Sequence, residues 1–279
     1  MSADLAVLTI HGMGNTPETY ADDLMERLER KLGTQLWRRI HVGKIYYQNI
    51  LQQNQVRMFR DMRQNSEIDY IKLRQFLLFG FSDAAGLERK ASAAGSPYER
   101  AQQAIQGTLN AAWNALGATP KPVMIFAHSL GCQVMSNYIW DSQSPSSGQG
   151  VWKDSPPTGT EKDHFLRLKS LRALYTTGCN IPIFLAGFPM DELVSFKTKS
   201  GGYDFEWHNF YDEDDVLGWP LKPMSPSFAA EVTSDHAINA DGGLVGKLVS
   251  GWNPLSHNEY WKDSEVLNRA ARTIQNLML

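Results

Sequence analysis

The sequence predicts an α/β protein with a mostly parallel sheet and helices on both faces. Residues 5–10 and 122–127 are apolar and rich in β-branched or bulky side chains, which is typical of buried strands. Segments with helical spacing alternate with such strands along the chain, as in parallel α/β sheets. At 279 residues, 42% of them apolar, the chain can bury one sizeable core, so we expect a single domain over residues 1–279.

In the first half of the chain, a helix is predicted to begin at Thr16 and Pro17. Apolar residues recur every four positions after this start, and Gly33 is placed to end the helix. A strand is expected over residues 39–47, followed much later by a helix over residues 98–116.

In the second half, the strand at 122–127 leads through a short turn into a helical segment at 132–139. Further strands are expected at 169–176 and 203–211, and a last helix at 264–277. Residues 141–160 are rich in Ser, Pro and Gly and predict a mobile loop.

Residues 48–97 are too long for an ordinary connection between a strand and a helix. They contain a dense apolar cluster at 76–81. We interpret 48–97 as a candidate helical cap or lid over the site, with Phe79 or Phe81 facing an acyl pocket. The alternative is that these residues pack as extra helices beside the sheet.

The most informative motif lies between the strand at 122–127 and the helix after it. Ala127 and Gly131 flank Ser129 at two residues on either side, so small residues surround a serine at a strand-to-helix turn. This pattern is typical of a nucleophile elbow, although glycine is more usual than alanine at the first position. The alternative is that Ser129 only caps an ordinary helix.

The first strand ends in a glycine-containing loop that suits an oxyanion hole. His11 is followed by Gly12, Met13 and Gly14, and glycines let a backbone approach a ligand closely. We predict the backbone N–H groups of Met13 and Leu130 as the two donors to a developing oxyanion. His11 is expected to brace the loop rather than to act as a base.

A carboxylate is needed to orient a catalytic histidine, and an acidic loop over residues 212–215 follows the strand at 203–211. Asp215 is our choice because it directly precedes an apolar pair and should point inward; Asp212 is the second choice. A calcium site is the alternative for this loop, but the spacing does not match an EF-hand.

Among seven histidines, His257 is the predicted base. It lies in a loop before the last helix, and the chain order Ser129, Asp215, His257 matches a known arrangement of the triad. His236 is the competitor, since it also follows the acidic loop.

Together these motifs resemble the α/β-hydrolase superfamily, and bacterial lipase- and esterase-like serine hydrolases in particular. The resemblance spans nearly the whole chain and implies the α/β-hydrolase fold, a Ser-His-Asp triad and no cofactor or metal. Because the first strand begins almost at Met1, the antiparallel strands that open the full fold are expected to be trimmed.

The resemblance implies cleavage of a carboxylic ester, of a small molecule or a lipid, through an acyl-enzyme. Alternatives are a thioesterase or amidase on the same triad, a lyase, or a non-catalytic ligand-binding protein on the hydrolase scaffold.

Composition limits the classes of binding partner and the cellular compartment that we expect. The net charge of −3 without a basic run argues against nucleic acid. No segment predicts a signal peptide or a transmembrane span, and the two cysteines fit a reduced compartment, so we expect a cytoplasmic protein. Peripheral membrane contact through the cluster at 76–81 is a weaker hypothesis, since its apolar residues are contiguous and do not form one helical stripe.

Overall fold

The computed structural model describes the following residues: 2–13, 16–48, 53–66, 71, 74, 78, 80, 82, 93–144, 148–197, 204–239 and 259–279. Within them, six strands form one sheet in the order β2-β1-β3-β4-β5-β6, and every neighbouring pair is parallel. The strands are β1 (Leu5–Ile10), β2 (Ile40–Ile45), β3 (Val123–His128), β4 (Leu171–Thr177), β5 (Glu206–Asp212) and β6 (Ser234–Ile238). The predicted parallel α/β sheet is therefore confirmed.

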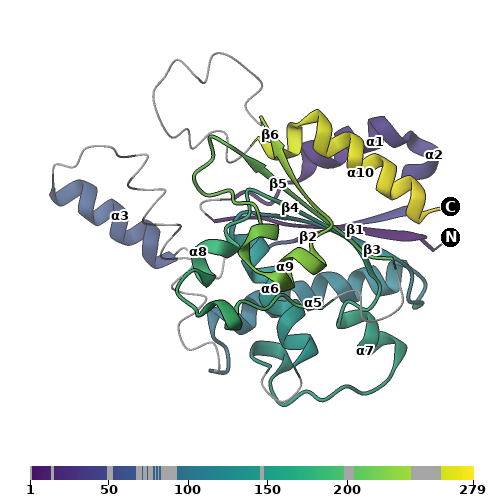
Figure 1. The fold of residues 1–279 in the computed structure, drawn as a ribbon, viewed down its shortest axis with the longest axis horizontal. Coiled ribbons are helices and arrows are strands. Elements are labelled where there is room, and N and C mark those ends of the chain that lie inside the picture. The colour runs from purple at the N-terminus through teal and green to yellow at the C-terminus, as the bar shows by residue number, and fades with distance from the viewer. Residues whose placement is uncertain are drawn as a thin grey trace.

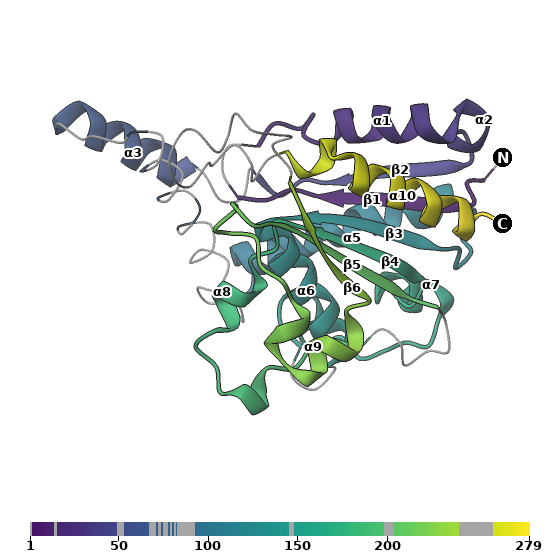
Figure 2. The ribbon, with the colours of Figure 1, turned by 45° about the horizontal axis from the view of Figure 1, so that its top comes forward.

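Helices cover both faces of the sheet, as predicted. On one face lie α1 (Asp22–Leu32) and α10 (Ser264–Leu277), and on the other lie α5 (Pro97–Ala115) and α6 (Leu130–Gln143) (Figures 1 and 2). The shorter helices are α2 (Thr34–Trp37), α3 (Gln53–Asn65), α7 (Glu161–Leu166), α8 (Ile181–Leu185) and α9 (Pro226–Glu231), with 3-10 turns η2 (Gly150–Trp152), η3 (Met190–Glu192), η5 (Lys222–Met224) and η8 (Tyr260–Lys262).

The alternation of side chains along β1 explains why this strand lies inside the sheet. All six of its residues are buried. Ala6, Leu8 and Ile10 pack on the side of α5 and α6, whereas Leu5 and Val7 pack on the side of α1 and α10. A strand buried on both faces needs a continuous apolar run, which is what residues 5–10 provide. Each large apolar side chain contributes about 1.5–3 kcal/mol.

The first helix begins later than predicted. α1 starts at Asp22 rather than at Thr16, and the residues just before it form a turn. The Tyr20 hydroxyl donates to the carbonyl oxygens of Thr9 at 2.9 Å and Ile45 at 3.2 Å. These bonds tie the turn to the ends of β1 and β2, a tertiary contact that local spacing does not reveal.

The segment at 141–160 is better packed than the predicted mobile loop, in the part that is described. Its first residues, to Gln143, belong to α6. Trp152 in η2 is buried, and the Arg167 guanidinium lies 4.3 Å from the centre of its ring. Arg167 also donates to the carbonyl oxygen of Ser155 at 2.8 Å, so one buried arginine anchors this segment to the core.

The strand order reverses at one point of the sheet. From β1 the chain goes to β2 on one side, and it then returns to β3 on the other side of β1. In open parallel sheets, ligands bind outside the carboxyl ends of the strands where the order reverses in this way. Here the reversal lies between the ends of β1 and β3, which lead into Gly12 and Ser129.

Candidate active site

Ser129 occupies a strained turn between β3 and α6. Its φ of 53° and ψ of −125° lie in a region that residues with a side chain rarely adopt. The Ser129 N–H donates to the carbonyl oxygen of Thr177 on β4 at 2.9 Å, which holds the turn against the sheet. Strain of this kind persists where the surrounding structure enforces it, and it clusters at functional sites. A strained serine between a strand and a helix is what the predicted nucleophile elbow requires.

Two glycines allow the loop after β1 to touch this turn. A Cβ atom on Gly131 would overlap the carbonyl oxygen of His11. A Cβ atom on Gly12 would lie 2.6 Å from the Ser129 Cβ and 3.1 Å from its Oγ. Ala127 is fully buried, so alanine fits at the position where glycine is more usual in the motif. The two loops therefore approach backbone to backbone around the serine hydroxyl.

The two predicted oxyanion donors come from different elements. Leu130 is the first residue of α6, where a backbone N–H has no acceptor within the helix. The helix dipole also favours negative charge at this end. Met13 follows Gly12, whose Cα lies against Ser129. Gly14 lies outside the described residues, so its predicted supporting role stays a prediction.

His11 is buried and fully engaged in bracing the loop. Its Nδ1 donates to the carbonyl oxygen of Gly12 at 2.8 Å, and its Nε2 accepts the Tyr47 N–H at 3.1 Å. The Tyr47 ring stacks on the imidazole at 4.1 Å, and its hydroxyl donates to the His11 carbonyl oxygen at 2.8 Å. Burial lowers the pKa of His11 to about 4, so the ring is neutral near pH 7. With both nitrogens occupied, this ring holds the loop in place.

Both candidate acids are buried at the carboxyl end of β5. Asp212 is the last residue of β5, and Asp215 lies in the turn after it. The Asp215 Oδ1 accepts the Leu217 N–H at 3.0 Å. Val216, the first residue of the apolar pair after Asp215, is exposed. Asp215 points inward as predicted, but the turn places it there and not an apolar neighbour.

Tyr260 contacts both Asp212 and Asp215, a role that the sequence analysis did not predict. Its hydroxyl donates to the Asp215 Oδ2 at 2.7 Å and accepts the Asp212 N–H at 2.9 Å. A Cβ atom on Gly218 would come within 2.6 Å of this hydroxyl, so the missing side chain leaves room for it. The available signal was weak, since an aromatic residue before the last helix usually indicates packing.

His257 lies outside the described residues, so its role as base stays a prediction. The chain leaves β6 at Ile238, beside the end of β5. A hollow of about 280 Å³ at this point is lined by Asp212, Glu213, Asp214 and residues 237–239. The segment that contains His257 thus starts at the acidic loop.

The competitor His236 lies well away from the serine. It is on β6, a strand that was not predicted because it is short and mostly polar. The strand register runs from His128 through Thr177 and Phe210 to His236. Three strand spacings separate the ends of this row, about 14 Å. The His236 ring stacks on Phe210 and contacts His208, on the face covered by α10.

One described residue of 48–97 lies against the loop after β1. Ser129 is fully buried, and Gly80 is also buried. A Cβ atom on Gly80 would overlap the Met13 sulfur, so this segment contacts the loop after β1. Phe79 and Phe81, predicted to face an acyl pocket, lie outside the described residues.

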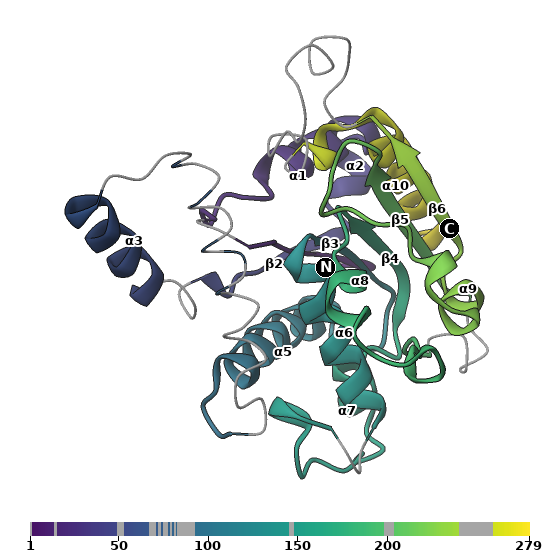
Figure 3. The same cartoon turned by 60° about the vertical axis from the view of Figure 1, so that its left-hand side comes forward.

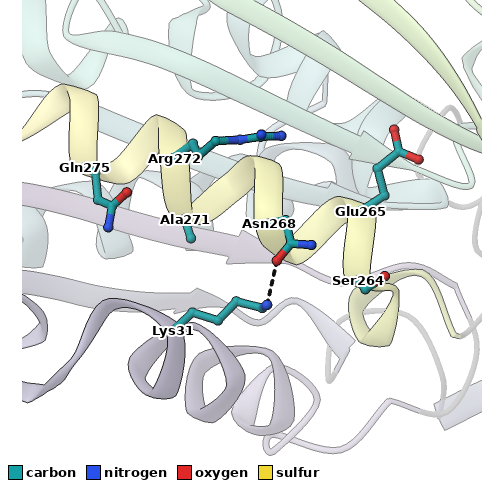
Figure 4. A pocket seen from close by; sticks show the side chains of 7 residues that line it. All are labelled: Lys31, Ser264, Glu265, Asn268, Ala271, Arg272 and Gln275. Atoms are coloured by element: carbon teal, nitrogen blue, oxygen red, sulfur yellow. Dashed lines mark hydrogen bonds between the residues drawn. The ribbon is translucent and has the colours of Figure 1, made fainter.

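A larger hollow of about 600 Å³ lies on the outer surface, between α1 and α10 (Figure 4). Lys31, Glu265 and Arg272 are among its lining residues, and Lys31 donates to Asn268 across it at 2.6 Å. None of the predicted site residues lines this polar groove, so it carries none of the predicted chemistry.

The comparisons with known proteins do not name a family. No family model matches the chain, and no significantly similar curated protein is found. Within the described ranges, no helix is long and apolar enough to cross a bilayer. In the same ranges, no group of three or more His, Cys, Asp or Glu residues could hold a metal ion.

Proposed function

We propose that the protein is a serine hydrolase that cleaves a carboxylic ester through an acyl-enzyme. The observation that carries this proposal is the strained backbone of Ser129, at the point where the strand order reverses. A glycine loop and a helix N-terminus flank its hydroxyl. A structural serine needs no such strain.

In the proposed acylation step, the Ser129 Oγ attacks the ester carbonyl carbon while His257 accepts the Oγ proton. The Oγ–C bond forms, and the carbonyl oxygen becomes an oxyanion held by the N–H groups of Met13 and Leu130. The C–O bond to the alcohol then breaks, and His257 returns the proton to the departing alcohol oxygen.

Deacylation repeats these roles with water as the nucleophile. His257 removes a proton from water, the hydroxide attacks the acyl carbon, and the Ser129 Oγ leaves with the proton. Asp215, fixed by Tyr260 and the Leu217 N–H, stabilises the imidazolium in both steps. Donors fixed in advance need no reorganisation during the reaction, which is why such sites are rigid.

The test is labelling with a small fluorophosphonate, followed by mass spectrometry of the modified peptide. We expect the wild type to be labelled at Ser129, and Ser129→Ala to be unlabelled and to lose at least about 10³-fold in ester turnover. Ser136, on α6 two turns further on, provides the control, since Ser136→Ala should label like the wild type.

A folded wild type that fails to label would contradict the proposal and favour a non-catalytic ligand-binding protein. Labelling at Ser129 with turnover of thioesters or amides, but not of oxygen esters, would keep the triad and change the substrate class.

A further inference from the structure

Exposed apolar side chains stand on several connections of the fold. Of the eleven large apolar residues that are exposed in the described part of the chain, three are on α3 after β2, four lie in residues 181–194 after β4, and two follow β5. The three on α3 share one helix.

The helix α3 stands out from the rest of the fold. In Figures 1, 2 and 3 it extends away from the sheet, beyond the carboxyl ends of the strands, while both termini lie at the opposite end in Figures 1 and 2. Met58 and Met62 lie one turn apart and are 51% and 41% exposed. Phe59, which follows Met58, is buried, so the helix is anchored at this residue while the two methionines stay exposed.

The charge of α3 indicates which kind of surface its exposed apolar side chains bind. The helix contains Arg57, Arg60 and Arg63 against a single acid, Asp61. Arg57 and Asp61 lie 3.8 Å apart, which leaves two arginines in excess. A short helix with exposed methionines on one side and arginines on the other is typical of segments that lie in the interface of an anionic membrane.

A lipid surface suits the exposed side chains of α3 better than a folded partner does. A fluid bilayer can adapt to isolated apolar projections on a helix, whereas a folded partner needs a matching surface.

We propose that α3, through its exposed methionines and its excess of arginines, docks the protein on an anionic phospholipid bilayer. Docking would bring the carboxyl ends of the strands toward the lipid. Since Ser129 lies at those ends, the docked site would act on esters held in the bilayer, an extension that rests on the proposed function.

The test is flotation of the full chain with phosphatidylcholine vesicles and with vesicles of phosphatidylcholine and phosphatidylglycerol at about four to one. We expect the wild type to float with the anionic vesicles, at least about fivefold more than with the neutral ones. The double variant Met58→Asp, Met62→Asp and the double variant Arg60→Gln, Arg63→Gln should each lower flotation at least fivefold. Trp140, equally exposed on the far part of α6, is the matched control, and Trp140→Asp should float like the wild type.

Three outcomes would overturn docking: a wild type that stays at the bottom with both vesicles, methionine variants that float normally, or a Trp140→Asp protein that loses binding equally. A wild-type dimer in light scattering that Met58→Asp, Met62→Asp converts to monomer would assign the surface to a second copy. Hydrolysis of a soluble short-chain ester separates the two proposals. Docking variants should keep that activity, and a wild type that floats but never hydrolyses it would refute only the proposed function.

Discussion

The two ends of the sheet hold polar groups in opposite ways. At the amino end, Asp4 pairs with Arg39 at 2.7 Å and Lys121 at 3.2 Å, and all three side chains are at least partly exposed. Hydrogen bonding from Arg39 is the main cause that lowers the pKa of Asp4. At the carboxyl end, Ser129 and Asp215 are buried, and their described partners are backbone groups and one tyrosine hydroxyl.

The contrast follows from the exposure of the two groups of side chains. Exposed ion pairs are screened by water and contribute little, so the amino end tolerates change. Buried polar groups at the carboxyl end lose hydration, and they persist because fixed partners compensate for it. The strained Ser129 backbone adds about 1–3 kcal/mol of stored strain there. A protein keeps such an arrangement where rigid positioning serves a function.

Among the substitutions that compare the two ends of the sheet, Gly12→Ala is expected to have the largest effect. The added methyl group would lie 2.6 Å from the Ser129 Cβ, so either the loop or the elbow must shift. A displacement of about 1 Å at a reacting group can lower the rate about 10²-fold. Ester turnover of the purified variant, beside its thermal unfolding, measures this.

Gly107→Ala is the control for this substitution, because a Cβ atom on Gly107 in α5 meets nothing within 4 Å. That variant should keep full activity and gain about 0.5–1 kcal/mol of stability. If Gly12→Ala retained wild-type turnover, the close approach of the two loops would have no catalytic role.

A second test separates positioning from stability at Tyr260. Tyr260→Phe removes the donor to Asp215 and the acceptor of the Asp212 N–H, and we expect turnover to fall roughly 10-fold to 100-fold. Tyr138→Phe is the matched control, since its buried hydroxyl donates to the Leu166 carbonyl oxygen at 2.7 Å away from the site. Both variants should lose about 1–3 kcal/mol of stability.

Measurement of kcat, KM and denaturant unfolding for both variants decides between these roles. Only Tyr260→Phe should lower kcat. The pH dependence of kcat should also differ from that of the wild type in this variant alone. Equal kcat in the two variants would make Tyr260 a purely structural residue.

A smaller effect is expected on the free energy of unfolding when the pH is lowered, because His11 is buried as a neutral ring. The pKa of His11 is lowered to about 4 in the folded protein, so the folded state prefers the neutral ring. The stability that this preference contributes is complete above about pH 6.5, and it is lost as the pH falls toward about 4. Between about pH 7 and about pH 5 the loss amounts to roughly 2 kcal/mol.

Urea unfolding at the two pH values measures this loss, and His11→Gln should reduce the difference. His164→Gln, a change on the exposed surface of α7, should leave the difference as it is in the wild type. A pH dependence unaltered by His11→Gln would show that another group is responsible.

The smallest effect is expected at the amino end. Asp4→Asn breaks both exposed ion pairs, yet it should lower the free energy of unfolding by less than about 1 kcal/mol. Added salt should shrink the difference between variant and wild type. A larger loss that is insensitive to salt would mean that the two ends of the sheet are more alike than their exposure indicates.

Much of the fold was predictable because its signals are local. The continuous apolar runs of β1 and β3 identify strands buried on both faces, and the small residues around Ser129 identify a sharp turn. β6 escaped prediction because Ser234–Ile238 is short and largely polar, and this edge strand is defined by pairing with β5.

The local sequence was enough to predict the parallel α/β architecture, the sharp turn at Ser129 and the glycine loop after β1. These depend on side-chain size and hydrophobic periodicity, which neighbouring residues carry. Only the tertiary structure decided that His11 is a neutral brace and that Tyr260 joins the two acids. It also decided that His236 lies three strands from the serine. Those contacts join residues far apart in the chain, and packing the strands side by side is what brings them together.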